Sequence, residues 1–186
     1  VAMGEGALQN QNFTSATSTY NTAIGYSAGL NITTGTQNTI LGSLAGDALT
    51  DADYNVAVGY GALTADTLGS TSTAVGRAAL NAQNFTSATN SNNTAVGYHA
   101  GLSVSTGTNN TFVGSLAGDA NTSASNNTAL GASSLGANTT GTQNTALGVQ
   151  ALLSNETSNN NVAIGFQALR LNTAANNTAV GVQAMD

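Results

Sequence analysis

A five-residue core of the form Asn-Thr-Ala-Val-Gly recurs along the chain, and its spacing limits the possible folds more than any other feature. The step from one core glycine to the next is 17 in seven of ten intervals, 21 in two and 16 in the last. An interval of this length is too short for a strand, a helix and two connections, because even a βαβ unit needs about 30 residues. The spacing therefore predicts an all-β parallel β-solenoid (β-roll) of about eleven 17-residue coils, in which like residues stack on like residues. The core glycines are Gly4, Gly25, Gly42, Gly59, Gly76, Gly97, Gly114, Gly131, Gly148, Gly165 and Gly181.

A longer repeat is superimposed on the short one. The heptapeptide QNFTSAT at 11–17 returns at 83–89, and SLAGDA at 43–48 returns at 115–120, so the two segments return at the same offset. This offset equals three ordinary intervals and one lengthened interval, and a block of four coils therefore looks duplicated. We expect a single β-solenoid repeat domain over residues 1–186, with coils lengthened by four residues near 9–20 and 81–92. Because Val1 opens in the middle of a repeat, we also expect the sequence to be a fragment of a longer chain.

Positions counted from the core glycine as zero form regular columns. Position −3 is always Thr or Val and position −1 is always Met, Ile, Leu or Val, so these two positions share one face of a strand. We expect this face to point inward and the alternate position −2, which is mostly alanine, to form an apolar strip that packs on another copy of the chain. The oligomer-contact candidates are Ala23, Ala57, Ala74, Ala95, Ala129, Ala146 and Ala163.

Asparagine occupies position −4 in nine of the ten copies that have this position, and Ser72 is the exception. Stacked asparagine amides hydrogen-bond from one layer to the next in parallel β-structure. We therefore predict a structural ladder, and a row of polar ligands for a sugar or an ion is the alternative interpretation. The ladder residues are Asn21, Asn38, Asn55, Asn93, Asn110, Asn127, Asn144, Asn161 and Asn177.

Charged residues are few, and their types exclude some functions. The chain has two Lys and Arg residues against eight Asp and Glu residues, for a formal net charge of −6. Nucleic acid is therefore not expected as the main ligand, because phosphate contacts need a basic surface. Charged residues amount to 5% and no long apolar run is present, so we expect a folded chain without a membrane span. The chain has no cysteine, so no disulfide is expected.

Side chains with catalytic or metal-binding chemistry are isolated from one another. The single histidine, His99, occupies a variable position, and we expect it to be solvated; no enzymatic activity and no cofactor are predicted. Asp47, Asp51 and Asp53 form the one local acidic cluster, for which a solvated turn is the main interpretation and a calcium site the alternative. Ice binding through rows of threonine is a further alternative, but we expect the threonines at position −3 to point inward or into the ladder.

Aromatic residues at two kinds of position are candidates for contact with a partner. Tyr26, Tyr60 and Tyr98 directly follow a core glycine, where they could stack on sugar rings, although packing of the outer strand is the simpler explanation. Phe13 and Phe85 lie in the two lengthened coils. A loop that folds its own phenylalanine onto the rod is the simpler interpretation there.

The segments NTAIGYSAGL, NVAVGYGAL, NTALGVQAL and NVAIGFQAL resemble known fibre repeats. They are similar to the repeats in the heads of YadA-type trimeric autotransporter adhesins and to the NTA-x-G-x-x-AL repeats of phage tail-fibre-like proteins. The resemblance covers the whole chain. It implies a left-handed, homotrimeric β-roll located extracellularly, at a cell surface or in a virion tail fibre.

The resemblance also implies a function. The chain would be a structural shaft in a surface adhesin or tail fibre that presents a binding tip or flank to a host-surface protein or glycan. The adhesin-head repeats are usually shorter than the repeats of this chain, so the longer coils here leave room for a larger outer corner. The alternatives are a solenoid whose repeated face binds carbohydrate, ice or calcium, and a self-assembling extracellular filament subunit.

Overall fold

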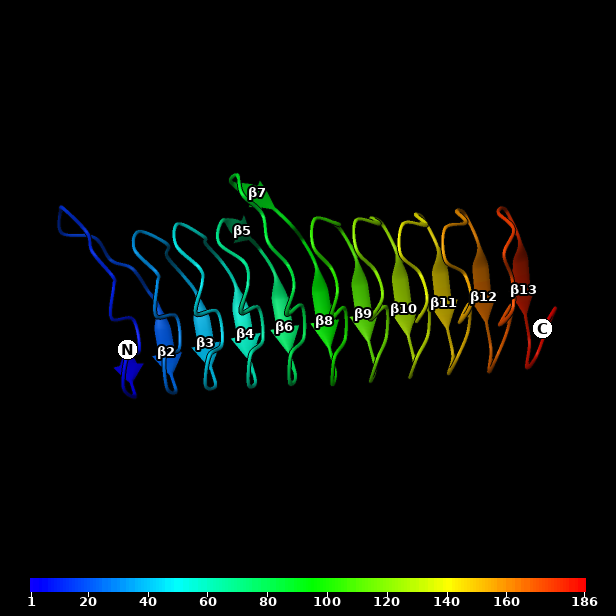
Figure 1. Ribbon diagram of the computed structural model, residues 1–186, viewed down its shortest axis with the longest axis horizontal. Helices are drawn as coiled ribbons and strands as arrows, with labels where there is room; N and C mark the ends of the chain where they lie inside the picture. Colours follow the sequence, from blue (N-terminus) through cyan, green and yellow to red (C-terminus); the bar gives the residue numbers. More distant parts are fainter.

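The computed structural model describes residues 1–186 and consists of strands and turns without a helix. Eleven short strands stack in chain order into one parallel sheet that runs the length of an elongated rod (Figure 1). Two further strands, β5 (Gly69–Ser70) and β7 (Thr89–Asn90), pair with each other beside it. The main sheet consists of β1 (Ala2–Met3), β2 (Thr22–Ile24), β3 (Thr39–Leu41), β4 (Val56–Val58), β6 (Thr73–Val75), β8 (Thr94–Val96), β9 (Thr111–Val113), β10 (Thr128–Leu130), β11 (Thr145–Leu147), β12 (Val162–Ile164) and β13 (Thr178–Val180).

The register of the sheet confirms that one interval between core glycines forms one coil. Thr73 pairs with Thr94 and Val75 with Val96, so each column of the sequence lies above itself in space. Hydrogen bonds join successive coils outside the strands as well, as in Gly29 N–H to the Ala45 carbonyl at 3.0 Å. The predicted parallel β-solenoid is therefore present, with about eleven coils of the expected length. At roughly 4.8 Å per coil, the rod is about 50 Å long.

The core glycine is required both by its backbone angle and by the closeness of the next coil. Gly114 has a φ of 138°, a conformation that side chains with a Cβ rarely adopt. A Cβ placed on it would lie 2.6 Å from the carbonyl oxygen of Gly131 in the following coil. The strand therefore ends at this residue, and the chain can turn without separating the coils.

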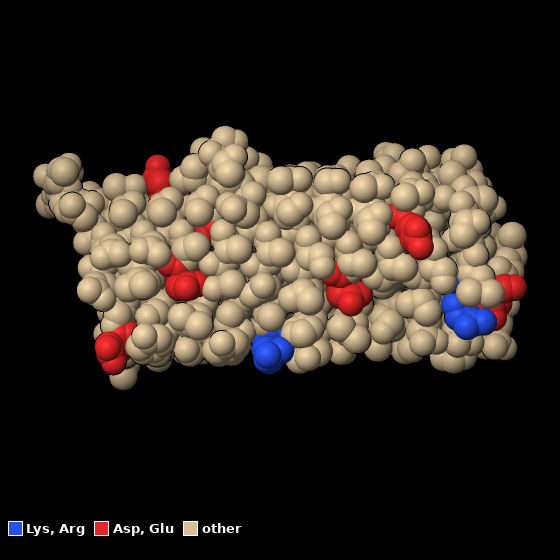
Figure 2. Space-filling view, in the orientation of Figure 1, with Lys and Arg blue, Asp and Glu red and all other residues tan.

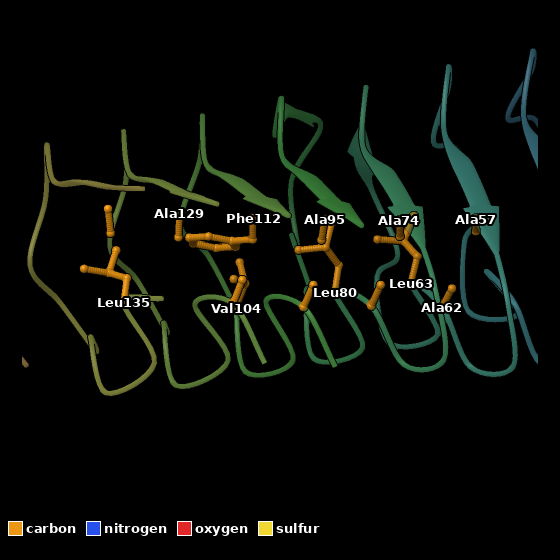
Figure 3. Packing of buried hydrophobic residues seen from close by; sticks show 14 of the residues in the cluster. Ala57, Ala62, Leu63, Ala74, Leu80, Ala95, Val104, Phe112, Ala129 and Leu135 are labelled. Carbon is orange, nitrogen blue, oxygen red and sulfur yellow. The ribbon is translucent and has the colours of Figure 1, made fainter. Parts of the chain in front are cut away.

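The interior of each coil is lined by the alanine column, which corrects the expected orientation of the strands. Ala95, like the other alanines at position −2 in the internal coils, is 0% exposed within a single chain. Figure 3 shows Ala95 and Phe112 pointing from the strands toward Leu80 and Val104 on the opposite wall. The two walls are so close that little more than a methyl group fits at most coils, and the bulkier side chains at −3 and −1 point outward. These alanines therefore cannot be the oligomer contacts that we expected: Ala23, Ala57, Ala74, Ala95, Ala129, Ala146 and Ala163.

Larger core side chains come from the opposite wall, at either of two positions. Where position +4 is leucine, position +7 is polar, as in Leu63 with Asp66 and Leu152 with Asn155. In three of the four coils where position +4 is glycine, an aliphatic residue at +7 fills the same space, and a Cβ on Gly46 would lie 2.9 Å from the Leu49 side chain. In the fourth coil, that of Gly118, the ring of Phe112 fills this space. Each coil thus holds about one large aliphatic side chain, because its cross-section has room for one.

The asparagine column forms a buried ladder, with a hydrogen-bonding pattern that the sequence did not specify. The amide oxygen of Asn21 accepts the backbone N–H of Asn38 at 2.8 Å, and the Asn38 oxygen accepts that of Asn55 at 2.9 Å. The amide nitrogen of Asn38 donates to the Ala52 carbonyl at 2.7 Å, which joins the start of the coil to its end. The ladder therefore links neighbouring coils and also closes each coil. Its residues are buried or half-buried, as expected for a structural role.

A buried carboxylate holds the second lengthened coil. Asp66 is 0% exposed and accepts the backbone N–H groups of Gly69 at 3.1 Å and Phe85 at 3.0 Å, together with the Gln83 amide at 2.6 Å. Gln83 also reaches Ser72, where the asparagine ladder is interrupted. The four extra residues leave the rod above this network, where β5 and β7 lie apart from the main sheet (Figure 1).

Candidate functional site

The outer face of the main sheet is the largest regular surface of the rod. The two columns at positions −3 and −1 point away from the alanine-lined interior, so each coil adds one β-branched and one aliphatic side chain to this face. Leu130 is 51% exposed and Ile164 is 39% exposed, although both belong to the expected inward column. The result is a continuous strip along the rod, with an aliphatic column at −1 and a column of threonine and valine at −3, which we call the sheet face. Its −1 column consists of Met3, Ile24, Leu41, Val58, Val75, Val96, Val113, Leu130, Leu147, Ile164 and Val180.

The sheet face is almost free of charge. No charged residue and no histidine occupies positions −5, −3 or −1 in any coil. Position +1, at its margin, carries two charged residues, Glu5 and Arg77. Figure 2 shows few charged side chains on one side of the rod, and they are scattered apart from an adjoining pair at one end. An extended uncharged apolar surface of this kind is typical of a surface that contacts another molecule.

The threonines of the sheet face also point outward, so the expected inward orientation is wrong. Thr94 and Thr145 are half-buried, whereas Thr111 and Thr128 are exposed. Position −3 is threonine in eight coils and valine in three. The parallel register places these hydroxyl groups in one straight row at the strand spacing, about 4.8 Å.

The aromatic candidates divide into exposed tyrosines and sheltered phenylalanines. Tyr26, Tyr60 and Tyr98 are 56%, 54% and 48% exposed at the margin of the sheet face. Phe85 is buried, and a Cβ on Gly69 would lie 2.8 Å from its ring, so it fills a core position beneath the lengthened loop. Phe13, in the first lengthened coil, is half-buried. Phe85 therefore does not serve as an exposed partner contact, because burial of its ring anchors its own loop.

A polar and aromatic cluster interrupts the column at position +1. Arg77 lies in the coil between those of Tyr60 and Tyr98, and its Cζ is 5.8 and 5.6 Å from the centroids of their rings. The Arg77 Nη1 atom is 2.7 Å from His99 Nε2, and the His99 ring stacks on that of Tyr98 with centroids 3.8 Å apart. His99 is thus half-buried against its neighbours and is not the freely solvated side chain that we expected.

The acidic residues of the local cluster, for which a calcium site was the alternative interpretation, lie in different columns, where each contacts a threonine of a neighbouring coil. Asp51 accepts the Thr34 hydroxyl at 2.7 Å, and Asp53 accepts the backbone N–H of Thr36 at 2.6 Å. Asp47 accepts the Thr64 hydroxyl. No group of three or more metal-ligating side chains is assembled. In this structure, these carboxylates join coils at the rod's outer corners.

Asp119 is half-buried, and this burial changes the pKa of its carboxyl group. Desolvation raises the pKa of Asp119 above its ordinary value, and hydrogen bonds from the backbone of Asp119 and Ala120 oppose that shift in part. The carboxyl group lies at position +5, on the wall next to the sheet face. Its charged form is therefore slightly unfavourable in the folded chain.

The structure contains no helix with the length and hydropathy needed to cross a membrane. Comparison of the chain with protein-family models, with curated proteins and with solved structures gives no match.

Proposed function

We propose that the chain is a shaft segment of an extracellular fibre, a surface adhesin or a phage tail fibre, in which three copies associate through the sheet face. The observation that supports the proposal is an uncharged face whose aliphatic column at position −1 runs without interruption along the rod. In a monomer such a strip would remain in water, at a cost of about 25 cal/mol for each Å² of apolar surface.

The size of the sheet face suits association with a second copy of the chain. From position −3 to position +1 a strand covers about 13 Å, and eleven coils cover about 50 Å, so the strip measures roughly 650 Å² before its roughness is counted. A stable protein interface needs about 800 Å² per partner. Because the strip has almost no charge, a charged partner would find no complementary groups on it. The trimeric state and the left-handed winding follow the resemblance to adhesin-head repeats.

Native mass spectrometry and light scattering test the proposal. The expected mass is three times the 18.3 kDa of one chain. Replacing Val58 and Leu147 with Asp should reduce the mass to that of a single chain while the circular dichroism spectrum stays the same, because both side chains point away from the coil interior. Thr140→Asp, on an exposed outer corner, is the matched control and should leave the mass unchanged. A wild-type protein that remains monomeric would refute association.

The outward row of threonines favours ice binding as a second candidate. Regularly spaced hydroxyl and aliphatic groups on a flat, uncharged sheet form an ordered surface on which water molecules can align. Ice and a second copy of the chain would compete for this same face. Measurable thermal hysteresis that disappears in Thr111→Tyr, together with a monomeric mass, would favour ice binding over the fibre.

A further inference from the structure

The four residues Tyr60, Arg77, Tyr98 and His99, which we call the arginine site, occupy three consecutive coils at one margin of the sheet face. Tyr60, Arg77 and Tyr98 directly follow core glycines, whereas His99 is half-buried at position +2. The fold does not require these residues, because the same column holds Ser43, Ser115 or Ala132 in other coils. All five tyrosines of the chain fall between 20 and 98, so the tyrosine surface is confined to one half of the rod.

Arg77 is the arginine without a carboxylate partner. The other arginine, Arg170, forms a salt bridge with Asp186 in which Nε and Oδ1 are 2.8 Å apart. The one hydrogen bond of the Arg77 guanidinium group in the structure joins Nη1 to His99. Its Nε and Nη2 donors therefore remain free in a chain whose formal net charge is −6.

Neighbouring side chains hold the guanidinium group in place. The two tyrosine rings lie on either side of it along the rod, each within the range of a cation–π interaction. His99 accepts its Nη1–H and is itself fixed by stacking on Tyr98. A group that is already held in one orientation loses little conformational entropy when a ligand binds.

The free donors are suited to a carboxylate, because guanidinium binds a carboxylate through two parallel hydrogen bonds. The tyrosine rings add a second recognition element, since the faintly positive C–H groups of a sugar ring pack well on the negative face of an aromatic ring. Tyr26 and Tyr60 are two coils apart, at about 9.6 Å along the rod, so they can contact successive parts of one extended chain.

An acidic peptide fits this site less well than an acidic sugar. A peptide binds most tightly by adding a strand to a free sheet edge or by lying in a groove. Here β4, β6 and β8 are each paired on both sides, and the structure has no pocket. A ridge of exposed rings beside one cation provides stacking surfaces and a charge for an acidic sugar polymer. It provides neither a free strand edge nor a groove for a peptide backbone.

We propose that the arginine site binds an acidic polysaccharide, with a sugar carboxylate on Arg77 and the neighbouring sugar rings along Tyr60 and Tyr26. The site lies at the margin of the sheet face, beside the proposed contact between copies. It gives the rod a binding function of its own along its flank.

Calorimetric titration of the protein in its native assembly tests the site with hexamers of galacturonate, mannuronate and sialate. At least one of the three should bind, and its methyl ester, which lacks the charge, should bind about tenfold or more weakly. Arg77→Gln should weaken binding by about ten- to a hundredfold, as expected for the loss of a charge-assisted pair. Arg170→Gln removes the same charge elsewhere and should leave binding unchanged. Tyr60→Ala should weaken binding, whereas Tyr20→Ala, at an exposed tyrosine outside the site, is its matched control.

Four outcomes would overturn the proposal: no binding of any hexamer, equal affinity in Arg77→Gln and wild type, equal affinity for the methyl ester, or equal affinity for polyglutamate. The last outcome would indicate a site for acidic peptides. The circular dichroism spectrum of Arg77→Gln should match that of wild type, because uncharged residues occupy the same column in other coils. Its mass should also equal that of wild type, so a failure of this proposal and a failure of the fibre proposal are distinguishable.

Discussion

At the scale of single residues, the interior of each coil is governed by volume. Among the differences between the two copies of the four-coil block, two are linked: Ile40 and Leu49 in the first copy correspond to Phe112 and Asn121 in the second. The larger Phe112 fills space that Leu49 occupies in the first copy, and a Cβ on Gly118 would lie within 2.7 Å of its ring. The exchange keeps the volume but leaves the Asn121 amide buried, with neither its nitrogen nor its oxygen hydrogen-bonded.

Asn121→Val should therefore stabilise the protein. The change removes a buried amide without partners, and valine already occupies the equivalent position in the preceding coil, as Val104. An unsatisfied buried polar group costs about 1 to 3 kcal/mol, so we expect the free energy of unfolding to rise by that amount. Denaturant unfolding monitored by circular dichroism measures it. The double variant Phe112→Ile with Asn121→Leu recreates the Ile40 and Leu49 pair and is the control for packing. A lower stability of Asn121→Val would mean that the amide has a role beyond packing.

Asp119 predicts a dependence of stability on pH. Because burial raises its pKa in the folded chain, the folded state binds the proton more tightly than the unfolded state, and stability falls as the pH rises through this pKa. Asp119→Asn imitates the protonated form and should raise the unfolding temperature at pH 7. The gain should be below about 1 kcal/mol, because the group is partly exposed and solvent screens it. At about pH 2, where carboxyl groups are protonated in both states, wild type and variant should unfold together. An equal gain at both pH values would contradict the assigned cause.

At the scale of elements, the sequence predicted the strands, their parallel register and the asparagine ladder, because each depends on a column of identical or similar residues. It did not predict which face of each strand points inward. Positions −3, −2 and −1 are all apolar or β-branched, as in Thr94, Ala95 and Val96, so hydrophobicity does not distinguish the two faces. Which face points inward depends on the distance between the two walls of the coil. That distance follows from the conformation of the turns. Several turn residues, such as Leu44 and Leu63, have positive φ values that their side chains do not suggest.

The candidate functional site was also only partly predicted from the sequence. Tyr26, Tyr60 and Tyr98 were placed correctly on the outside, because a residue next to a turn glycine stays near the surface. The cluster of Arg77 with His99 was missed, because its members are far apart in the sequence and meet only when the lengthened coil is closed. The aligned columns contained the signal, since Arg77 falls in the column of Tyr60 and Tyr98.

Replacing a core glycine with alanine should lower the free energy of unfolding by an amount that depends on the position of the glycine along the rod. Gly114 and Gly181 have similar φ values of 138° and 135°, but a Cβ on Gly181 would meet only Ala184, at 3.7 Å. Gly181→Ala should therefore cost about 1 to 3 kcal/mol for backbone strain alone. Gly114→Ala should cost more than about 4 kcal/mol, because the next coil must also move. Thermal unfolding of the two variants separates the cost of backbone strain from the cost of the contact with the next coil. Equal losses of stability would show that the contact with the next coil makes no contribution.

At the scale of the whole molecule, a solenoid is nearly one-dimensional, because each coil contacts only its neighbours. Length can therefore change in units of whole coils while the columns stay in register. The internal duplication is consistent with this property, because the two lengthened coils lie at equivalent places in the two copies of the block.

Deleting residues 40–111 should shorten the rod without changing its fold. The deletion removes four coils and joins Thr39 to Phe112, so the interval from Gly25 to Gly114 regains the length of one ordinary coil. Gly29 and Ile32 take the places of Gly101 and Val104 beneath Phe112, as the duplication requires. Small-angle scattering should show a maximum dimension smaller by about 19 Å, with an unchanged circular dichroism signal per residue. Deleting residues 40–110 is the control, because its one-residue shift would turn inward side chains outward at the junction. That variant should lose stability sharply, and equal stability of the two deletions would mean that stacked columns do not hold the rod together.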